Sequence, residues 1–320
     1  MKAIQITQTG GPEVLKYVDV PDPKPGKGQA LLRMQAIGVN YMDVNGRAGT
    51  AAQLPWIPGG EGAGTVVELG EGVTEVKVGD VVAYANANFS YAEKVAAPAW
   101  RLVKVPQGMD PKTCAAAMLQ GMTAHYLACS TYPLKPGDSC LVHAAAGGVG
   151  SLLVQVAKMR GATVIATVSS QEKAELVTGL GADHVINYAE QDFEAEVKRI
   201  TKGAGVQVVY DGVGRDTFDK SLASLGRRGV LALYGAASGP VAPISPTILN
   251  AGSKYLTRPS LGDYTANREE LLGRANELLG WIRDGKLKLI ISATLPLRDA
   301  AEAHRKMQGR ETVGKVVLIP

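Results

Sequence analysis

The 320-residue sequence is poor in cysteine, with three residues whose spacing matches neither a disulfide framework nor a zinc-binding motif. Cys114, Cys129 and Cys140 are therefore expected to be reduced and mostly buried. No long apolar run occurs near the start, where MKAIQITQTGG alternates polar and apolar residues as a strand does. These features argue against a signal peptide and against a membrane span. We therefore expect a cytoplasmic protein.

Aromatic residues are also scarce, at 5%, and charge of one sign does not accumulate. The 34 basic and 30 acidic residues give a net charge of +4, without a block of like charges. A nucleic-acid-binding surface needs a basic stripe and aromatic stacking platforms, so we expect no nucleic-acid partner. With 46% hydrophobic residues, the chain is long enough for about two domains with large cores.

Roughly the first 110 residues show short alternating segments separated by Gly and Pro, which is the pattern of a β-rich domain. From Thr113 the apolar spacing changes to three and four, which predicts a long helix rich in small residues. Strands are expected at residues 2–7, 30–37, 64–69, 81–85 and 91–96.

Short β-branched strands alternating with helices follow that long helix. Nearly continuous apolar strands in such a pattern indicate a parallel sheet buried on both faces, so we predict an α/β doubly wound domain at residues 124–260. The tail, residues 261–320, lacks a core of its own and is expected to complete the first domain, residues 1–123. The strands are expected at residues 140–143, 163–168, 184–187, 206–210, 230–233 and 255–257, with tail helices at 268–283 and 299–307 and a last strand at 314–319.

A glycine-rich turn, AAAGGVG at residues 144–150, directly follows a predicted strand and opens a predicted helix at residues 151–159. Gly147 and Gly150 supply the spacing of a phosphate turn, and Ala145 stands where a first glycine is usual. Glycines there let the backbone approach a pyrophosphate, whose charge meets free N–H groups and the positive end of the helix. This context predicts dinucleotide binding.

The end of the next strand selects between the two nicotinamide cofactors. An acidic residue there would hold the ribose 2′-hydroxyl of NADH, but the chain instead has Ser169, Ser170 and Lys173. Glu172 falls inside the helix start, where it serves the positive end of the helix dipole. Hydroxyls and a lysine favour a 2′-phosphate, so NADPH is predicted, the alternative being that Lys173 is an ordinary solvated residue.

Several motifs in order along the chain resemble one family, the zinc-independent quinone oxidoreductases. With zeta-crystallin, this family belongs to the medium-chain dehydrogenase/reductase superfamily. The resemblance runs the full length of the chain. Its motifs are residues 10–15 (GGPEVL), 38–43 (GVNYMD), 144–150, 210–214 (YDGVG), 257–261 (TRPSL) and 318–320 (LIP).

The resemblance implies a GroES-like β-rich catalytic domain, a Rossmann domain with NADPH between the two, and a homodimer. Gly212 and Ala236 depart from the family, which frequently has polar residues there, so individual hydrogen bonds at these positions are in doubt. The cofactor contacts that transfer onto this sequence are Asn40, Tyr41, Met42 and Asp43 near the nicotinamide, Tyr126 on the first long helix, Gly147, Gly148, Val149 and Gly150 in the turn that meets the pyrophosphate, Ser169, Ser170 and Lys173 at the adenosine phosphate, and Tyr188, Gly212, Val213, Gly235, Ala236, Arg258, Pro259, Ser260 and Arg310.

Zinc-dependent members of the superfamily carry a cysteine at the position of Asn40, a histidine soon after, and later a His-Glu pair. Here those positions hold Asn40, Asp43 and the pair Gly60 and Glu61, so we expect no metal. Glu61 is expected to be a structural carboxylate that caps backbone N–H groups. The histidines show no ligand spacing, and His143 is expected to be structural.

Direct hydride transfer to a quinone requires no nucleophile from the protein. Asn40 and Tyr41 are candidates to polarise an acceptor oxygen, and Arg258 is a candidate to add positive charge, although all three fit a purely positioning role equally well. Asp43 is expected to be a solvated, ionised hydrogen-bond anchor rather than a general acid.

The predicted activity is therefore the metal-independent reduction of a small-molecule quinone by NADPH. An alternative within the same cleft is reduction of an activated C=C bond in an enone or alkenal. An alternative of another class is a non-catalytic structural or RNA-binding role like that of zeta-crystallin-like proteins.

Overall fold

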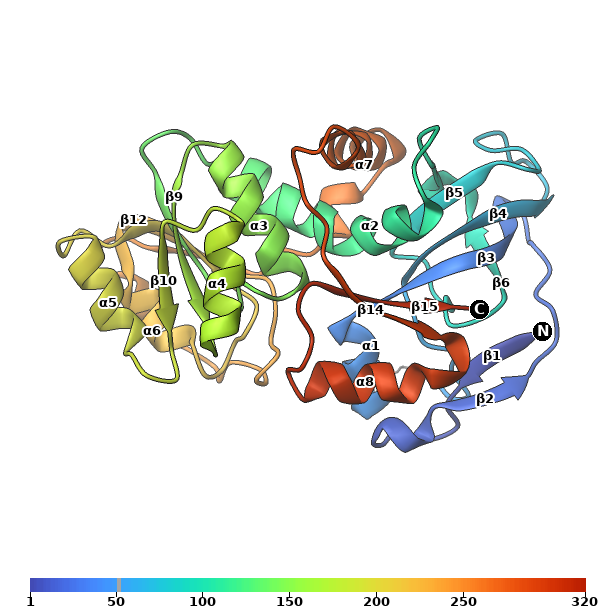
Figure 1. The fold of residues 1–320 in the computed structure, drawn as a ribbon, viewed down its shortest axis with the longest axis horizontal. Helices are drawn as coiled ribbons and strands as arrows, with labels where there is room; N and C mark the ends of the chain where they lie inside the picture. Colours follow the sequence, from blue (N-terminus) through green and yellow to red (C-terminus); the bar gives the residue numbers. More distant parts are fainter. Residues whose placement is uncertain (51–52) are drawn as a thin grey trace. The chain divides into compact units, whose positions relative to one another are not determined.

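The computed structural model describes residues 1–50 and 53–320, and the chain divides into two compact units (Figure 1). The first unit comprises Met1–Met122 and Thr265–Pro320, and the second comprises Thr123–Tyr264. Each unit has its own sheet and its own cluster of buried apolar side chains, so each is described by itself.

The first unit is built on a seven-stranded sheet of order β14-β15-β3-β4-β5-β7, with β6 also paired to β3. Along β3, Leu32 and Met34 are buried whereas Arg33 and Gln35 are exposed, as expected of a strand with one face on the core. The last strand, β15, pairs antiparallel with β3, so the C-terminal segment completes this sheet. The strands are β1 (Lys2–Gln5), β2 (Lys16–Asp19), β3 (Gln29–Val39), β4 (Glu61–Leu69), β5 (Val81–Ala85), β6 (Lys94–Pro98), β7 (Val103–Lys104), β14 (Ile291–Pro296) and β15 (Lys315–Ile319).

The second unit is a six-stranded sheet of order β10-β9-β8-β11-β12-β13 in which every pair is parallel. This order is that of a Rossmann fold, and the strands nearest the middle are almost wholly buried, as a sheet covered on both faces requires. The elements are β8 (Ser139–Val142), α3 (Gly148–Met159), β9 (Thr163–Val168), α4 (Gln171–Gly179), β10 (His184–Asn187), α5 (Phe193–Ile200), β11 (Val206–Asp211), α6 (Phe218–Ala223), β12 (Leu225–Leu233) and β13 (Tyr255–Thr257).

Four further helices are α1 (Tyr41–Asn45), α2 (Pro111–Tyr126), α7 (Arg268–Arg283) and α8 (Ala300–Gln308). Small residues let α2 pack closely, because a Cβ added at Gly121 would lie 2.6 Å from the Leu278 side chain of α7. Helix α7 begins where the Asn267 side chain accepts a hydrogen bond from the backbone N–H of Glu270.

The predicted α/β class, with a β-rich part and a doubly wound part, is confirmed, and the bounds of β5, β9, β10, β13 and α7 match the predicted ranges. The strand predicted at 91–96 is wrong at its start, because Ala92 bridges Ala3 of β1 and β6 begins only at Lys94. The strands β2, β7 and β14 were not predicted.

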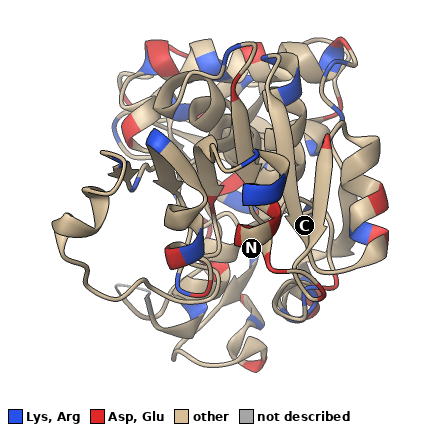
Figure 2. Ribbon diagram, turned by 90° about the vertical axis from the view of Figure 1, so that its left-hand side faces the viewer, with Lys and Arg blue, Asp and Glu red and all other residues tan. Residues whose placement is uncertain are grey.

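Acidic and basic residues are interspersed along both units (Figure 2). Among residues 1–50 and 53–320, no helix is both long and apolar enough to cross a bilayer.

Candidate active site

The predicted phosphate turn lies between β8 and α3, with Gly147 as the residue that caps the helix. A Cβ at Gly150 would lie 2.3 Å from the carbonyl oxygen of Ala144, so only glycine fits there. The Ala145 N–H donates to the carbonyl of Thr167 at 3.1 Å and ties the turn to the end of β9. The first N–H groups of α3 have no partner within the helix, so the turn can receive a pyrophosphate.

Ser169, Ser170 and Lys173 come together at the start of α4. The Ser170 hydroxyl accepts from the Lys173 backbone N–H at 3.3 Å, and the Lys173 ammonium donates to the Ser169 hydroxyl at 3.4 Å. Glu172 lies in the first turn of α4, as expected, and the Tyr188 N–H donates to the carbonyl of Val168 beside them. Two hydroxyls and a cation therefore face the place where a carboxylate would select NADH.

Asp211 ends β11 and organises the turn that follows. One carboxylate oxygen accepts from the backbone N–H groups of Val213 and Gly214, at 2.8 and 3.0 Å. Gly212 lies against Gly235 at the end of β12, where a Cβ at Gly235 would be 2.3 Å from the Gly212 carbonyl oxygen. The structure thus brings the predicted residues Gly212, Val213, Gly235 and Ala236 to one edge of the sheet through backbone contacts.

A series of hydrogen bonds between buried polar side chains connects the ends of β8, β9 and β11, where these turns begin. His143, at the end of β8, bonds through Nδ1 to the Thr167 hydroxyl and through Nε2 to the Ser221 hydroxyl, both at 2.9 Å. The Ser221 hydroxyl in turn donates to the second carboxylate oxygen of Asp211 at 2.8 Å. Burial lowers the pKa of His143, so the neutral ring links three strand ends.

The segment after β13 also packs on this unit. Arg258 Nη1 donates to the Leu233 carbonyl at 2.9 Å, which holds the guanidinium at the end of β12. The Tyr126 hydroxyl donates to the Pro259 carbonyl at 3.5 Å, and its ring stacks on Tyr264 with centroids 4.4 Å apart. The Ser260 hydroxyl donates to the Asp263 carboxylate.

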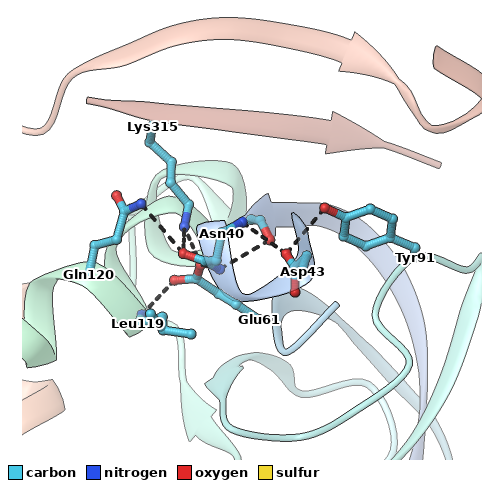
Figure 3. Close-up of polar contacts among 8 residues, drawn as sticks. Asn40, Asp43, Glu61, Tyr91, Leu119, Gln120 and Lys315 are labelled. Atoms are coloured by element: carbon cyan, nitrogen blue, oxygen red, sulfur yellow. Dashed lines mark hydrogen bonds and ion pairs between the residues drawn. The ribbon is translucent and has the colours of Figure 1, made fainter. Parts of the chain in front are cut away.

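In the first unit, the residues at the zinc-ligand positions of the superfamily form a buried polar cluster (Figure 3). We call Asn40, Asp43, Glu61, Gln120 and Lys315 the Asn40 cluster. The Lys315 ammonium donates to Glu61 Oε2 and, at 2.7 Å, to Asn40 Oδ1. Glu61 Oε1 accepts from the backbone N–H of Leu119 at 2.5 Å. Glu61 therefore caps a backbone N–H, as expected, but its main partner is a lysine that the sequence analysis missed.

Both polar atoms of the Asn40 side chain form hydrogen bonds with buried groups. Its Nδ2 donates to Glu61 Oε2 at 2.8 Å and to the Gly38 carbonyl at 3.4 Å, while Oδ1 accepts from Lys315 and Gln120. Asn40 is 3% exposed. Because both amide protons point inward, this geometry favours the positioning role of Asn40 over polarisation of an acceptor oxygen.

The expectation that Asp43 is solvated is wrong, because the side chain is 3% exposed. Its Oδ2 accepts from the Asn40 backbone N–H at 2.8 Å and from the Tyr91 hydroxyl at 3.2 Å, so the anchoring role is confirmed. Burial raises the pKa of Asp43 to about 7. Tyr91 also contacts His304 Nε2 at 3.1 Å, and burial, with Arg47 nearby, lowers the pKa of His304 to about 3.

Tyr41 and Met42 follow Asn40 and are 37% and 55% exposed. Asn40 is buried and held by its hydrogen bonds, and these two side chains lie on the exposed side of the first turn of α1. Arg310 lies in the first unit just after α8, with a left-handed φ of 58°, whereas Arg258 belongs to the second unit. Of the three predicted catalytic candidates, Asn40 and Tyr41 therefore belong to the first unit and Arg258 to the second.

Lys315 and Gln120 are the cluster members that sequence reasoning missed. A single lysine in the strand KVVLI, otherwise almost wholly apolar, was a signal of a buried cation. In the described part of the chain, no group of three or more His, Cys, Asp and Glu side chains is arranged to hold a metal ion.

One chain that contains both a β-rich unit and a Rossmann unit with a phosphate turn has the domain composition of a dehydrogenase/reductase of the medium-chain type. Residues 26–129 match the alcohol dehydrogenase GroES-like domain, and residues 148–275 match the family described as zinc-binding dehydrogenase.

Relatives that match over their full length show to which family within this superfamily the chain belongs. The chain is 44% identical to a 2-haloacrylate reductase of Burkholderia sp., over 99% of this chain and 98% of the relative. It is 43% identical to a quinone oxidoreductase of Pseudomonas aeruginosa, over 100% and 99%. It is similar to the solved structure of mycobacterial Rv1454c complexed with NADPH, at 50% identity and a TM-score of 0.97 over 100% of both chains. The chain belongs to the quinone oxidoreductase family, which confirms the resemblance seen in its motifs.

Proposed function

We propose that this protein is an NADPH-dependent quinone reductase that works without a metal. The observation that carries the proposal is the Asn40 cluster: the positions of a catalytic zinc site hold the Asn40 amide, the Asp43 carboxyl group, and the Glu61 carboxylate paired with the buried Lys315. Glu61 has both oxygens engaged, one by Lys315 and Asn40 and the other by a backbone N–H. The donor set thus fits a structural ion pair rather than a zinc ligand shell.

The residues of the second unit fit NADPH. Gly150 leaves the space that a Cβ would fill, and Ser169, Ser170 and Lys173 offer donors for a 2′-phosphate. When bound, NADPH supplies the hydride. The proposed cofactor domain is residues 124–260, and the proposed catalytic domain is residues 1–123 with 261–320. The proposed contacts are those inferred from the resemblance: Asn40, Tyr41, Met42, Asp43, Tyr126, Gly147, Gly148, Val149, Gly150, Ser169, Ser170, Lys173, Tyr188, Gly212, Val213, Gly235, Ala236, Arg258, Pro259, Ser260 and Arg310.

The protein's part in the reaction is to hold an acceptor flat and to stabilise the negative charge that develops on its oxygen. Tyr41 is 37% exposed and follows Asn40 in the chain, and it fits that role better than Asn40, whose amide protons are both engaged in the interior. Arg258 supplies positive charge at the end of β12.

The test is the loss of NADPH absorbance with 1,4-benzoquinone, with NADH in parallel, before and after treatment with a chelator. Fast turnover that prefers NADPH and survives the chelator is expected. Absence of turnover with several quinones while NADPH still binds would contradict the quinone acceptor, and loss of turnover after chelation would contradict the metal-free mechanism.

Reduction of an activated C=C bond is the second candidate, since a relative at 44% identity is a 2-haloacrylate reductase. A hydride delivered to the β-carbon of an enone or haloacrylate needs the same rigid site and a proton at the neighbouring carbon. Comparing kcat/KM for 2-chloroacrylate, methyl vinyl ketone and 1,4-benzoquinone decides between the two acceptors.

We propose a homodimer that forms through β13, the last strand of its sheet. Tyr255 of this strand is 59% exposed, and Ile248 nearby in sequence is 38% exposed. An open strand edge with apolar side chains favours pairing with a second copy. A mass measured by light scattering at twice 33.5 kDa is expected, and a Tyr255→Lys change is expected to shift it toward one chain.

We propose that the protein acts in the cytoplasm and binds no nucleic acid. Among the described residues, Cys114, Cys129 and Cys140 form no disulfide, and the charges are interspersed (Figure 2). A gel shift with AU-rich RNA that weakens with salt would contradict the second part of this proposal.

A further inference from the structure

Tyr234 carries a hydroxyl group without a hydrogen-bond partner at the carboxyl end of β12 in the second unit. The residue directly follows Leu233, the last residue of that strand, and is partly buried. No other described residue forms a hydrogen bond with this hydroxyl, and its oxygen is not one of the unpaired polar atoms that are closed off from solvent. The hydroxyl is therefore accessible, whereas the Tyr126 and Tyr210 hydroxyls of the same unit donate to backbone carbonyls.

The phenol ring of Tyr234 occupies the space that Gly212 leaves open. A Cβ at position 212 would lie 2.8 Å from the Tyr234 hydroxyl oxygen and 2.9 Å from Cζ, which is closer than a Cβ approaches other atoms in folded proteins. The absence of a side chain at Gly212 thus lets the phenol lie against the turn that follows β11. Burial, with Asp211 and Tyr126 nearby, raises the pKa of Tyr234, so the hydroxyl stays protonated and can donate as well as accept.

The other donors in the turns after β11 and β12 are used within the unit. In the first turn, the backbone N–H groups of Val213 and Gly214 donate to the Asp211 carboxylate. In the second turn, those of Ala237 and Ser238 donate to carbonyl groups of the first turn, and the Ser238 hydroxyl does the same. Glycine and alanine at positions 212, 235 and 236 offer no polar side chain. The Tyr234 hydroxyl is therefore the side-chain group of these two turns that remains for a ligand.

The place of Tyr234 in the sheet indicates which part of a dinucleotide it faces. The strand order β10-β9-β8-β11-β12-β13 divides into two halves beside β8, and each half takes one nucleotide at the carboxyl ends of its strands. Ser169, Ser170 and Lys173 follow β9, so the proposed adenosine phosphate belongs to the half formed by β8, β9 and β10. The nicotinamide nucleotide then belongs to the ends of β11 and β12.

Within that nucleotide, the ribose is the nearest group to Tyr234. The ribose is bonded directly to the pyrophosphate, which the turn between β8 and α3 can receive. The phenol lies against Gly212 at the end of β11, and β11 is the strand next to β8, about 4.8 Å away. A ribose carries two hydroxyl groups that donate and accept, as a phenol hydroxyl does.

We propose that the Tyr234 hydroxyl forms a hydrogen bond with a ribose hydroxyl of the nicotinamide nucleotide when NADPH is bound. The inference rests on the proposed function, which supplies the cofactor, and it adds a contact residue to those proposed there. The residues that carry it all belong to the second unit. Tyr234 thereby orients the ribose, and Gly212 is a positioning residue that acts by leaving space for the phenol.

The test measures, by isothermal titration calorimetry, the binding of three ligands that share the adenosine 2′-phosphate. NADPH carries the whole nicotinamide nucleotide, 2′-phospho-ADP-ribose keeps its ribose without the nicotinamide ring, and adenosine 2′,5′-bisphosphate lacks both. Tyr234→Phe removes the hydroxyl alone. This variant is expected to bind NADPH and 2′-phospho-ADP-ribose about three- to tenfold more weakly, the effect of one neutral hydrogen bond, and to bind adenosine 2′,5′-bisphosphate with unchanged affinity.

Two further variants sharpen the comparison. Tyr210→Phe is the matched control, because the Tyr210 hydroxyl donates to the Tyr132 carbonyl at 3.4 Å, and it is expected to leave all three affinities unchanged. Gly212→Ala displaces the phenol and is expected to weaken the same two ligands as Tyr234→Phe. The double variant is expected to bind no more weakly than Gly212→Ala, because the hydroxyl contact is lost only once.

Equal weakening of all three ligands by Tyr234→Phe, or no weakening of any, would overturn the inference. Weakening of NADPH alone would also overturn it, by assigning the hydroxyl to the nicotinamide ring instead of the ribose. Additive effects of Gly212→Ala and Tyr234→Phe would contradict the role given to Gly212. The proposed function is judged separately, by quinone turnover of the wild-type protein. The expected pattern of affinities without quinone turnover would refute only the quinone, whereas no NADPH binding at all would refute both.

Discussion

Asp43 gives the protein an unusual dependence of stability on pH. Its pKa is raised from 3.8 to about 7, chiefly by burial, with Glu61 adding to the rise and Lys315, Tyr91 and the Asn40 N–H opposing it. The folded protein therefore holds a proton between pH 4 and 7 that the unfolded chain releases. By linkage, this carboxyl group costs the fold little near pH 4, and the cost grows as pH rises, to about 4 kcal/mol above pH 7.

Asp43→Asn removes the charge but keeps an oxygen that can accept from Asn40 and Tyr91. We expect the variant to match wild-type stability near pH 4 and to exceed it increasingly toward pH 9, by up to about 4 kcal/mol. Urea denaturation followed by tryptophan fluorescence measures this selectively, because all three tryptophans, Trp56, Trp100 and Trp281, lie in the first unit.

Asp19→Asn is the matched control, since Asp19 is an exposed carboxylate of the same unit. Its hydrogen bond to Lys2 lowers the pKa of Asp19, so its contribution has the opposite sign and appears above pH 4. A stability difference between wild type and Asp43→Asn that stays constant from pH 4 to pH 9 would refute the reasoning, because it would mean that Asp43 titrates alike in the folded and unfolded chain.

Three further predictions concern the two units. Lys315→Met leaves the buried Glu61 carboxylate without its counter-charge, so a loss of about 3–5 kcal/mol is expected in the same urea assay, most of it recovered in Lys315→Met with Glu61→Gln; no recovery would contradict the pairing. Lys173→Met is expected to lower the preference for NADPH over NADH about ten- to hundredfold in kcat/KM, and an unchanged ratio would mean that the preference is set elsewhere. Gly38→Ala should destabilise the first unit by about 1–3 kcal/mol, since its Cβ would lie 2.2 Å from Glu61 Oε2, whereas Gly273→Ala, with open space around it, should not.

Sequence reasoning predicted best the elements whose signal is local. The phosphate turn needs glycine within a few residues of a strand and a helix, and Gly150 occupies the tight position expected of it. All residues of the strand β9 except Ala166 are β-branched, so its bounds could be predicted from the sequence. In β14, Ile291, Ala293 and Leu295 alternate with Ser292, Thr294 and Pro296, which is a strand pattern that the sequence analysis did not use.

The Asn40 cluster could not be predicted because its members meet only after folding. Lys315 and Asn40 are 275 residues apart, and Glu61 and Asn40 are 21 apart, so neither periodicity nor motif spacing connects them. The environment of Asp43 depends on the same long-range packing, which is why a carboxylate beside two exposed residues was mistaken for a solvated one.

Gly38 shows how a motif can be recognised before its physical reason is known. Its backbone does not require glycine, because it lies inside β3 and its φ is not positive. The constraint is steric: a Cβ would collide with the Glu61 carboxylate and approach Lys315 Cε to 2.8 Å. The glycine of the GVNYMD motif therefore makes room for the buried ion pair. Lys315 and Glu61 in turn hold the two ends of the Asn40 amide, so the space left at Gly38 is a condition for the fixed position of Asn40.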